Sequence, residues 1–421
     1  MALSGGVDSV VLLHLLSALA PRLDIELSAM HVNHGLSPQA DAWQAFCRRL
    51  CASLGIPLEE VRVEVPMAAA SGLEAAARKA RYGAFARVDA AYIAQAHQRD
   101  DQAETLLFNL LRGSGLAGAA AMPAVRPFPG RPGLQILRPL LEVSRDEIAS
   151  YAQERQLAWI EDESNRDVRH ARNFLRRNIL PLIQERFPGC DASLARAATH
   201  FAEGEALLVQ LAEIDARTAM RDGRIVVAEF ARLDESRARN LLRHVLKSAG
   251  MSMPDSARLR EAVRQVCEAA ADRQVTIDLG PCMLYRYRGE LWLTQPAVMP
   301  QAVEWRGEQK LAWGGDVLRF ERGVGSGIGM DRLAGQPIRL APRRGGEHFR
   351  PDARRPRRDL RKLLQERGVP PWLRKVMPLL WCGEELVWVP GIGTDCAWQC
   401  APDATGLLPE WVQASGKSQS P

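Results

Sequence analysis

The chain has 421 residues, of which 47% are hydrophobic and 25% are charged, and its formal net charge is +5. This length exceeds what one hydrophobic core usually serves, so we expect two or three domains, and the composition excludes a disordered or fibrous protein. The sequence has no uninterrupted apolar run of about 18 residues, which argues against a membrane-spanning segment.

The first 110 residues alternate between helical and strand patterns. Helices are predicted over residues 9–20, 39–54, 73–91 and 101–111, and strands over residues 25–31, 56–65 and 91–96. Strands that alternate with helices indicate an α/β fold with a parallel sheet covered on both faces. Ligands of such sheets bind beyond the carboxyl ends of the strands.

The rest of the chain changes character twice. A Pro/Gly-rich loop at residues 122–133 and a helix at 144–155 precede a long helical stretch, and strands return at residues 273–280 and 283–294. We therefore predict an α/β catalytic domain over residues 1–190, a mostly helical domain over 191–298, a small α+β domain over 299–408 and a flexible tail over 409–421.

The eight cysteines form no CxxC pair, and Cys47/Cys51 and Cys396/Cys400 each have three residues between them. This pattern favours free thiols in a reducing cytoplasm over a disulfide framework, with a zinc or iron–sulfur site as the weaker alternative.

The glycine-rich stretch "LSGGVDSV" at residues 3–10 runs directly into an apolar helix. Such a turn presents backbone N–H groups at a helix N-terminus, where a phosphate is favoured. Ser4 and Ser9 add hydroxyl donors, and Asp8 suits a magnesium ion because a bare carboxylate would repel phosphate. The alternative is an ordinary capped helix start. Only "MAL" precedes the loop, where a strand of about five residues is expected, so we expect a shortened first strand or a start farther upstream.

Two carboxylates follow the strand at residues 91–96, in "AHQRDDQAET". Asp101 and Glu104 are three residues apart and share one helix face. One interpretation is a capping box with Asp101 as the N-cap and Glu104 at the third helical position. The other is a site for an ammonium group or magnesium at the carboxyl edge of the sheet.

Other polar residues cluster at predicted strand ends or on helices. His31 and His34 end a strand but have no third metal ligand, so base or hydroxyl contacts fit them better than zinc. Arg172 and Arg176 lie one helical turn apart and suit a phosphate clamp, or else intrahelical ion pairs. A GxGxxG pattern at residues 113–118 follows a helix rather than a strand, so we predict a flexible loop there and consider a nicotinamide enzyme a weak alternative.

A strongly basic segment lies between Arg343 and Lys375, with twelve basic and four acidic residues. This excess of eight positive charges indicates a polyanionic partner, and a solvated helix face is the alternative.

The stretches "SGGVDS", "HVNHGLS", "AHQRDDQAETLL", "RPLL", "IEDESN" and "RNFLRRNILP" occur in this order. That series resembles the tRNA(Ile)-lysidine synthetase family of PP-loop (N-type) ATP pyrophosphatases, and "RRGGEHFRPDARRPRRDLRKLLQERGVPPWLRKVMPLLW" resembles the tRNA-contacting C-terminal domain of the same family. The resemblance implies a Rossmann-type PP-loop catalytic domain. It also implies that ATP adenylates C2 of the wobble cytidine of tRNA(Ile) with a CAU anticodon, after which L-lysine displaces AMP. The tRNA then changes from a methionine reader to an isoleucine reader.

The resemblance also implies roles for individual residues, with ATP and Mg²⁺ as cofactors. The expected catalytic residues are Asp8, Asp101, Glu104, Arg112 and Arg172, with Arg138 as a further cationic candidate. The expected ATP-binding residues are Ser4, Gly5, Gly6, Val7, Asp8, Ser9, His31, Arg81 and His97, with Asp8 as the metal ligand. Asp101 and Glu104 are expected to bind lysine. The expected tRNA-binding residues are Arg176, Arg343, Arg354, Arg355, Arg357, Arg358, Arg361, Lys362, Trp372 and Arg374.

Two other functions share parts of this pattern. A PP-loop tRNA 2-thiocytidine synthetase has the same ATP loop but usually transfers sulfur through a cysteine pair, and a non-catalytic RNA-binding protein would need only the basic segment. The sequence leaves the oligomeric state open, with a homodimer as one option.

Overall fold

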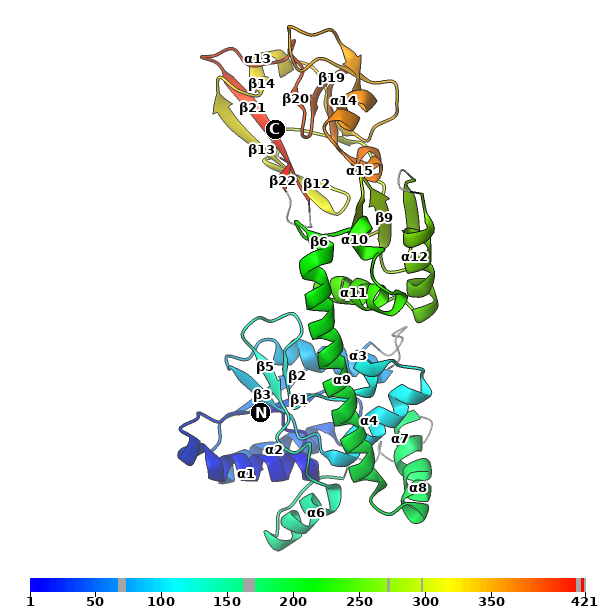
Figure 1. Cartoon of the computed structure of the whole chain (residues 1–421). Helices are drawn as coiled ribbons and strands as arrows, with labels where there is room; N and C mark the ends of the chain where they lie inside the picture. The colour runs from blue at the N-terminus through cyan, green and yellow to red at the C-terminus, as the bar shows by residue number, and fades with distance from the viewer. Residues whose placement is uncertain (67–72, 162–170, 271–272, 297, 414–417, 420–421) are drawn as a thin grey trace. The chain divides into compact units, whose positions relative to one another are not determined.

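The computed structural model describes residues 1–66, 73–161, 171–270, 273–296, 298–413 and 418–419. The chain divides into two units, Met1–Gln210 and Leu211–Pro421 (Figure 1). This division falls inside the long helix α9 (Cys190–Ala219), so the predicted domain boundaries at residues 190 and 298 stay predictions.

The first unit is built on a mostly parallel sheet. Strand β1 (Ala29–Asn33) pairs in parallel with β2 (Leu58–Arg62), and β3 (Tyr92–Ala94) pairs in parallel with β5 (Gln135–Leu137). Strand β4 (Val125–Pro127) adds an antiparallel edge to β5.

Residues 1–3 join these two groups of strands. The amide of Ala2 donates to the carbonyl of Ala94 (2.9 Å), and the amide of Leu3 donates to the carbonyl of Met30 (2.9 Å). The strand order is therefore β2, β1, residues 1–3, β3, β5 and β4, and the glycine-rich loop leaves the middle of the sheet.

The five helices predicted for this unit correspond to α1, α2, α3, α4 and α6, whereas α5, α7, η2 and α8 were not predicted. Their bounds are α1 (Val7–Leu23), α2 (Ala40–Ser53), α3 (Leu73–Phe85), α4 (Arg99–Leu111), α5 (Leu116–Ala119), α6 (Arg145–Glu154), α7 (Ala171–Phe174), the π-helix η2 (Leu175–Ile179) and α8 (Leu180–Arg186). Helix α1 is buried on several sides, because Leu13 packs with Leu3 and Ala29, whereas Val11 and Leu12 pack with α6. Burial of each such side chain contributes about 1.5–3 kcal/mol to the stability of the fold.

Two local predictions were wrong. Strand β1 begins at Ala29 rather than residue 25, because Asp24 adopts a left-handed conformation that ends α1, and Ile25 is 46% exposed. The predicted flexible loop at residues 113–118 contains the start of α5, which is held in place by the buried Ala119.

The second unit contains two separate hydrophobic cores. In the first, a five-stranded antiparallel sheet packs against helices α11 and α12. Its elements are β6 (Met220–Arg221), β7 (Arg224–Val226), α10 (Val227–Phe230), α11 (Glu235–Ser248), α12 (Ser256–Glu268), β8 (Val275–Asp278), β9 (Met283–Tyr287) and β10 (Glu290–Thr294). The strand order is β6-β7-β10-β9-β8. Strands β8 to β10 were predicted from the sequence, and β6 and β7 were not.

The second core lies between two further sheets, of order β11-β15-β18-β19-β20 and β12-β13-β21-β14. The strands are β11 (Val303–Glu304), β12 (Lys310–Trp313), β13 (Asp316–Val324), β14 (Ile328–Gly329), β15 (Ile338–Ala341), β16 (His348–Phe349), β17 (Arg358–Asp359), β18 (Leu379–Cys382), β19 (Glu385–Val389), β20 (Gly393–Thr394), β21 (Thr405–Val412) and β22 (Ser418–Gln419), and the helices are α13 (Met330–Leu333), α14 (Leu360–Glu366) and α15 (Pro371–Val376).

The start of the predicted flexible tail needs a correction. Residues 409–412 belong to strand β21, where Trp411 is fully buried and its indole N–H donates to Asp316 (3.0 Å). Residues 414–417 and 420–421 of that tail lie outside the described residues. Among the residues that the structure describes, no helix combines the length and the apolar character needed to cross a membrane.

Candidate active site

The glycine-rich loop connects the short central strand at residues 1–3 to helix α1. Gly5 has a φ of +90°, and a Cβ atom there would lie 2.7 Å from the Ile160 side chain, so only glycine fits. The Ser9 hydroxyl accepts from the amide of Gly5 (3.1 Å) and donates to the carbonyl of Gly6 (2.9 Å). Ser9 therefore shapes the loop from within, while Ser4 is exposed beside it.

The loop ends where α1 begins, so its amides face the positive end of the helix dipole. Gly6 is the N-cap of α1 and has no side-chain cap. The first amides of a helix have no intrahelical acceptor, and they favour an anion in front of them. This geometry supports the phosphate-binding interpretation for the amides of Gly6 and Val7, whereas the amide of Gly5 is bonded to Ser9 and Gly5 serves the turn.

Asp8 stands in the first turn of α1 as a half-buried carboxylate. Its Oδ1 atom is buried and has no hydrogen-bond partner among the described residues. Burial, and then the nearby Asp101 carboxylate, raises the pKa of Asp8 to about 6. A cation would relieve both effects, so the donor set fits the predicted role of Asp8 as a magnesium ligand.

Asp101 and Glu104 lie on helix α4, but the predicted capping box was wrong in its register. The helix begins two residues earlier, at Arg99, with Gln98 as its N-cap. The Gln98 side chain accepts from the amide of Asp100 (2.6 Å), and Asp101 accepts from the amide of Gln98 (3.1 Å). Asp101 is thus the third helical residue, which leaves Glu104 free of any capping role.

A guanidinium holds the two carboxylates together. Arg176 lies in the π-helix η2, and its Nη2 atom donates to Asp101 Oδ1 (2.8 Å) and to Glu104 Oε2 (3.0 Å), while its Nε atom donates to the other oxygen of Glu104. Glu104 is only 3% exposed, and burial raises its pKa while Arg176 opposes that rise. In this structure the two carboxylates are therefore paired with a guanidinium of the chain itself, and their predicted role toward an ammonium group or magnesium stays a prediction. A tRNA-binding role for Arg176 stays a prediction.

The histidines near the sheet edge are neutral hydrogen-bonding groups. Arg138 donates to His97 Nδ1 (3.3 Å), and burial followed by Arg138 lowers the pKa of His97 to about 3. Arg81 donates to His34 (3.3 Å), and burial lowers the pKa of His34 to about 4. His31 bonds to the carbonyl of Leu3 (2.9 Å) and lies buried beneath the loop.

Several arginines converge around His97. Arg138 is 3% exposed, and among the described residues its hydrogen bonds go to His97 and to the carbonyl of Pro123 rather than to a carboxylate. Burial, and then Arg126, lowers the pKa of Arg138 to about 10. Arg78, Arg81 and Arg172 also lower the pKa of His97. Because buried charges are normally paired, the surroundings of Arg138 suit an anionic ligand.

Phe108 belongs to this region but was not among the predicted site residues. The guanidinium carbons of Arg112 and Arg172 lie 5.2 Å and 5.5 Å from the centre of its ring. Phe108 and Arg112 are four residues apart on α4, so their spacing was the signal that could have predicted the contact. The Phe108 ring therefore brings together Arg112 and Arg172, two of the arginines that were expected to be catalytic.

The basic segment of the second unit is only partly available to a polyanion. Arg343 is paired with the buried Glu347 (2.9 Å), and Arg358 is paired with Glu366 (2.5 Å). Arg357 lies 3.7 Å from the buried Asp395, so its removal would test the fold as much as any RNA contact.

The other basic residues of the segment differ in whether they bond to the protein or are exposed to solvent. Arg355 lies 3.8 Å from Asp352, Arg374 donates to the carbonyl of Val369 (2.7 Å), and Arg354, Arg361 and Lys362 are exposed. The expectation that Trp372 is free to stack on a base needs a correction. One ring face of Trp372 already stacks on Tyr285, with ring centres 4.0 Å apart.

Comparisons with known protein families match three separate segments of the chain. Residues 1–183 match a PP-loop domain, residues 226–292 a TilS substrate binding domain, and residues 338–411 a TilS substrate C-terminal domain.

Curated relatives match along nearly the whole chain. The tRNA(Ile)-lysidine synthase of Nitrosomonas europaea is 42% identical over 98% of this chain and 91% of its own length. The enzyme of the same name from Aromatoleum aromaticum is 45% identical over 98% of this chain and 96% of its own.

Similarity to solved structures is more distant. The U34-tRNA thiolase NcsA from Methanococcus maripaludis, with its [4Fe-4S] cluster, has a TM-score of 0.41 and 20% identity, over 48% of this chain and 70% of its own. That likeness is too low to bear on the substrate. The near full-length matches to curated relatives, together with the three matched domains, show that this chain belongs to the tRNA(Ile)-lysidine synthase family.

Proposed function

We propose that this protein uses ATP to join L-lysine to C2 of the wobble cytidine of tRNA(Ile) with a CAU anticodon. One observation carries the proposal: a carboxylate pair that binds a cation lies directly beside a loop suited to phosphate. Asp101 acts electrostatically on Asp8 of that loop, so the two sites are neighbours. A ligase that brings an amine to an adenylated base needs both sites within one cavity.

The ATP site is supported by the loop amides and by the arginine cluster. The amides at Gly6 and Val7 would face a phosphate, and the buried Arg138 would gain the anionic partner that it lacks among the described residues. Its lowered pKa keeps His97 neutral at pH 7, so the ring can make hydrogen bonds to ribose or base without adding another positive charge. The arginines near Phe108 would stabilise charge that develops during transfer of the adenylyl group.

Asp8 would hold the magnesium ion, since its buried oxygen has no other partner among the described residues. When bound, such an ion neutralises phosphate charge and orients the pyrophosphate leaving group. The loop fixes Asp8 at the start of α1. The neighbouring Asp101 carboxylate adds negative charge near Asp8, and this charge would favour a bound cation.

The titration of Asp8 gives a test that needs no activity measurement. An unfolded aspartate titrates near ~3.9, and Asp8 in the folded protein has a pKa of about 6. The folded state therefore binds this proton more tightly, and its stability falls as the pH rises from about 4 to about 6.

Asp8→Asn should remove this part of the pH dependence. We expect the urea midpoint of the variant to fall less between pH 4 and 6 than that of the unsubstituted protein. Equal slopes for the two proteins would show that Asp8 titrates like an exposed aspartate.

Asp101 and Glu104 would bind the lysine side chain. The pair already accepts the guanidinium of Arg176, and an ammonium is a cation of the same charge. The amine must lose a proton before it attacks C2, and the raised pKa of Glu104 makes that carboxylate a better proton acceptor than an ordinary glutamate. Attack forms the C–N bond at C2, and AMP leaves with the former C2 oxygen.

The decisive experiment supplies ATP, labelled lysine and tRNA with a CAU anticodon. We expect lysine to enter the tRNA with stoichiometric release of AMP and pyrophosphate. The matched control is the same tRNA with uridine in place of the wobble cytidine, which should accept no lysine. ATP consumption without lysine incorporation into the CAU tRNA would contradict the proposal.

Sulfur transfer to the same base is the competing reaction. It is disfavoured because Cys47 and Cys51 are buried, and burial raises the pKa of Cys47 to about 12, which keeps the thiol protonated. A non-catalytic RNA-binding protein would have no use for the intact loop and carboxylate pair. A homodimer stays a prediction.

A further inference from the structure

A single guanidinium takes up most of the carboxylate pair of the first unit. Three of the four carboxylate oxygens accept from Arg176: Asp101 Oδ1 (2.8 Å), Glu104 Oε2 (3.0 Å) and Glu104 Oε1. The fourth, Asp101 Oδ2, accepts from the amide of Gln98 (3.1 Å). An ammonium group that binds both carboxylates must therefore take positions that the nitrogens of Arg176 hold in this structure.

The partners in this contact differ in how well they are shielded from solvent. The side chain of Glu104 is 4% exposed and that of Asp101 is 18% exposed, whereas that of Arg176 is 32% exposed. A buried carboxylate without a cation is destabilising, so the pair favours one cation at all times. Because the carboxylates are fixed in the fold and Arg176 approaches from the more open side, Arg176 is the partner that can be exchanged.

The helical segment that carries Arg176 is loosely attached to the unit. Residues 171–186 form α7, η2 and α8, and Leu175 is the one buried residue among these sixteen, all of which the structure describes. A short π-helical turn inside a helix is often found at functional sites. A segment with few buried apolar contacts moves at low cost in free energy, so Arg176 can leave the carboxylates without disturbing the core.

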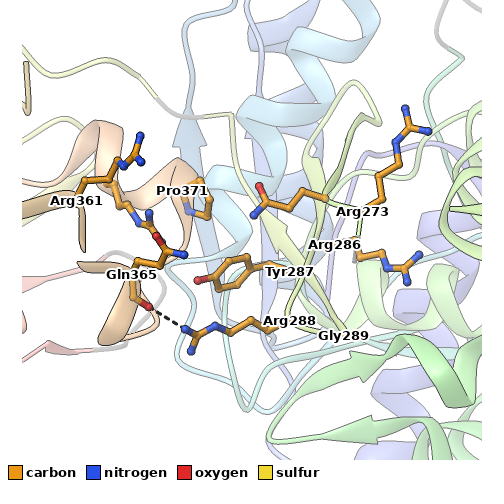
Figure 2. Close-up of a pocket in the computed structure, with 10 residues that line it drawn as sticks. Arg273, Arg286, Tyr287, Arg288, Gly289, Arg361, Gln365 and Pro371 are labelled. Atoms are coloured by element: carbon orange, nitrogen blue, oxygen red, sulfur yellow. Dashed lines mark hydrogen bonds between the residues drawn. The ribbon is translucent and has the colours of Figure 1, made fainter. Parts of the chain in front are cut away.

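Other arginines of the chain are held by neutral groups instead. In the second unit, Arg288 donates to the carbonyl of Gln365 (2.8 Å) and Arg374 to that of Val369 (2.7 Å), and both line a pocket of about 470 Å³ (Figure 2). A backbone carbonyl positions a guanidinium without offering a second cation a charged partner. The contact of Arg176 is different, because two carboxylates attract an ammonium as well as a guanidinium.

A second partner for Arg176 would lie on the glycine-rich loop. Burial and Asp101 raise the pKa of Asp8 in that loop, and the positive charge of Arg176 opposes the rise, so the guanidinium acts on the loop already. The amides of Gly6 and Val7 at the start of α1 suit a phosphate. Phosphate oxygens accept from a guanidinium in pairs. A phosphate on the loop would therefore compete with the carboxylates for Arg176.

We propose that Arg176 occupies the lysine site until a nucleotide phosphate binds to the glycine-rich loop. The proposal rests on the proposed function, because it takes Asp101 and Glu104 as the carboxylates that bind lysine. Lysine alone would replace one cation by another and leave Arg176 without an anion. With a nucleotide bound, the guanidinium keeps an anionic partner, so lysine and nucleotide strengthen the binding of each other. Arg176 is thus a positioning residue that sets the order in which the two ligands bind.

The test measures lysine binding to the full chain by calorimetric titration, without tRNA. Titrations are made with and without Mg²⁺ and an ATP analogue that cannot be cleaved between its α- and β-phosphates. We expect the unsubstituted protein to bind lysine about tenfold more tightly with the nucleotide, a coupling of the usual size between two sites. L-Norleucine keeps the stem of lysine but lacks the ammonium, and it should not bind under either condition.

The variant Arg176→Gln removes the internal cation. We expect it to bind lysine without nucleotide about as tightly as the unsubstituted protein does with nucleotide. The matched control is Arg186→Gln, which removes the same charge from the end of α8, where Arg186 is exposed and faces the ring of Phe187 (5.7 Å). This control should keep the full dependence on nucleotide. Arg176→Lys retains a cation beside the buried Glu104, so it should fold normally and keep the dependence as well.

Two results would overturn the proposal. One is an equal lysine affinity of the unsubstituted protein with and without nucleotide, and the other is a nucleotide dependence of Arg176→Gln as large as that of the unsubstituted protein. If added tRNA raises the lysine affinity and the nucleotide does not, the anion is not a nucleotide phosphate and the proposal is wrong. None of these titrations uses lysine incorporation, so a protein that incorporates lysine but shows equal affinities refutes the role of Arg176 alone.

Discussion

Replacement of Asp101 by asparagine should lower lysine incorporation by about a hundredfold or more while ATP and tRNA still bind. Asparagine keeps an oxygen that can accept from the amide of Gln98, so the cap of α4 survives. The variant removes the negative charge that faces Arg176 and, in our proposal, the lysine ammonium. Loss of one partner of a buried charge pair costs about 2–5 kcal/mol, which corresponds to about thirtyfold to several thousandfold. The measurement is the initial rate of labelled lysine incorporation.

Asp100→Asn is the matched control for this prediction. Asp100 lies in the same turn of α4 and accepts from the amide of Arg145 (3.1 Å), but it has no contact with Arg176. We expect nearly normal lysine incorporation from this variant. If Asp101→Asn also transfers lysine at the normal rate, Asp101 is a helix cap and nothing more.

Replacement of Arg138 by methionine should affect activity and stability in different ways. The buried guanidinium lacks a carboxylate among the described residues. Without a bound anion, its desolvation therefore lowers the free energy of unfolding. Methionine keeps an apolar stem and removes that cost, at the loss of two hydrogen bonds worth about 1 kcal/mol each. We therefore expect the thermal midpoint to stay level or rise, and release of pyrophosphate from ATP in the presence of tRNA to fall about a hundredfold.

Arg131→Met provides the comparison. Arg131 also donates to a backbone carbonyl, that of Ala86, but it does not act on His97. This variant should keep the rate of pyrophosphate release. A large loss of stability in Arg138→Met with normal pyrophosphate release would make Arg138 a structural residue.

Much of the first unit could be predicted from local patterns. The alternation of helices and strands is a short-range property of the sequence, and it correctly indicated a parallel sheet, whereas the central position of the glycine-rich loop came from the structure. The residues at which single helices and strands begin and end were harder to predict. The helix α4 begins at Arg99 because Gln98 supplies the cap, and glutamine is a less frequent N-cap than the nearby aspartates.

The sequence by itself determined which chemical groups the chain offers: a glycine-rich loop at Gly5 and Gly6, two carboxylates one helical turn apart at Asp101 and Glu104, and a basic segment far along the chain. These features depend on residue type and on spacings of a few residues, which the linear order preserves. The tertiary structure alone decided which charges are neutralised. Arg176 contacts Glu104 from 72 residues away, Arg357 lies 3.7 Å from the distant Asp395, and Arg138 is buried without a carboxylate among the described residues. Charge pairing depends on distance in space and on the solvent that burial removes, and neither quantity is written in the order of the residues.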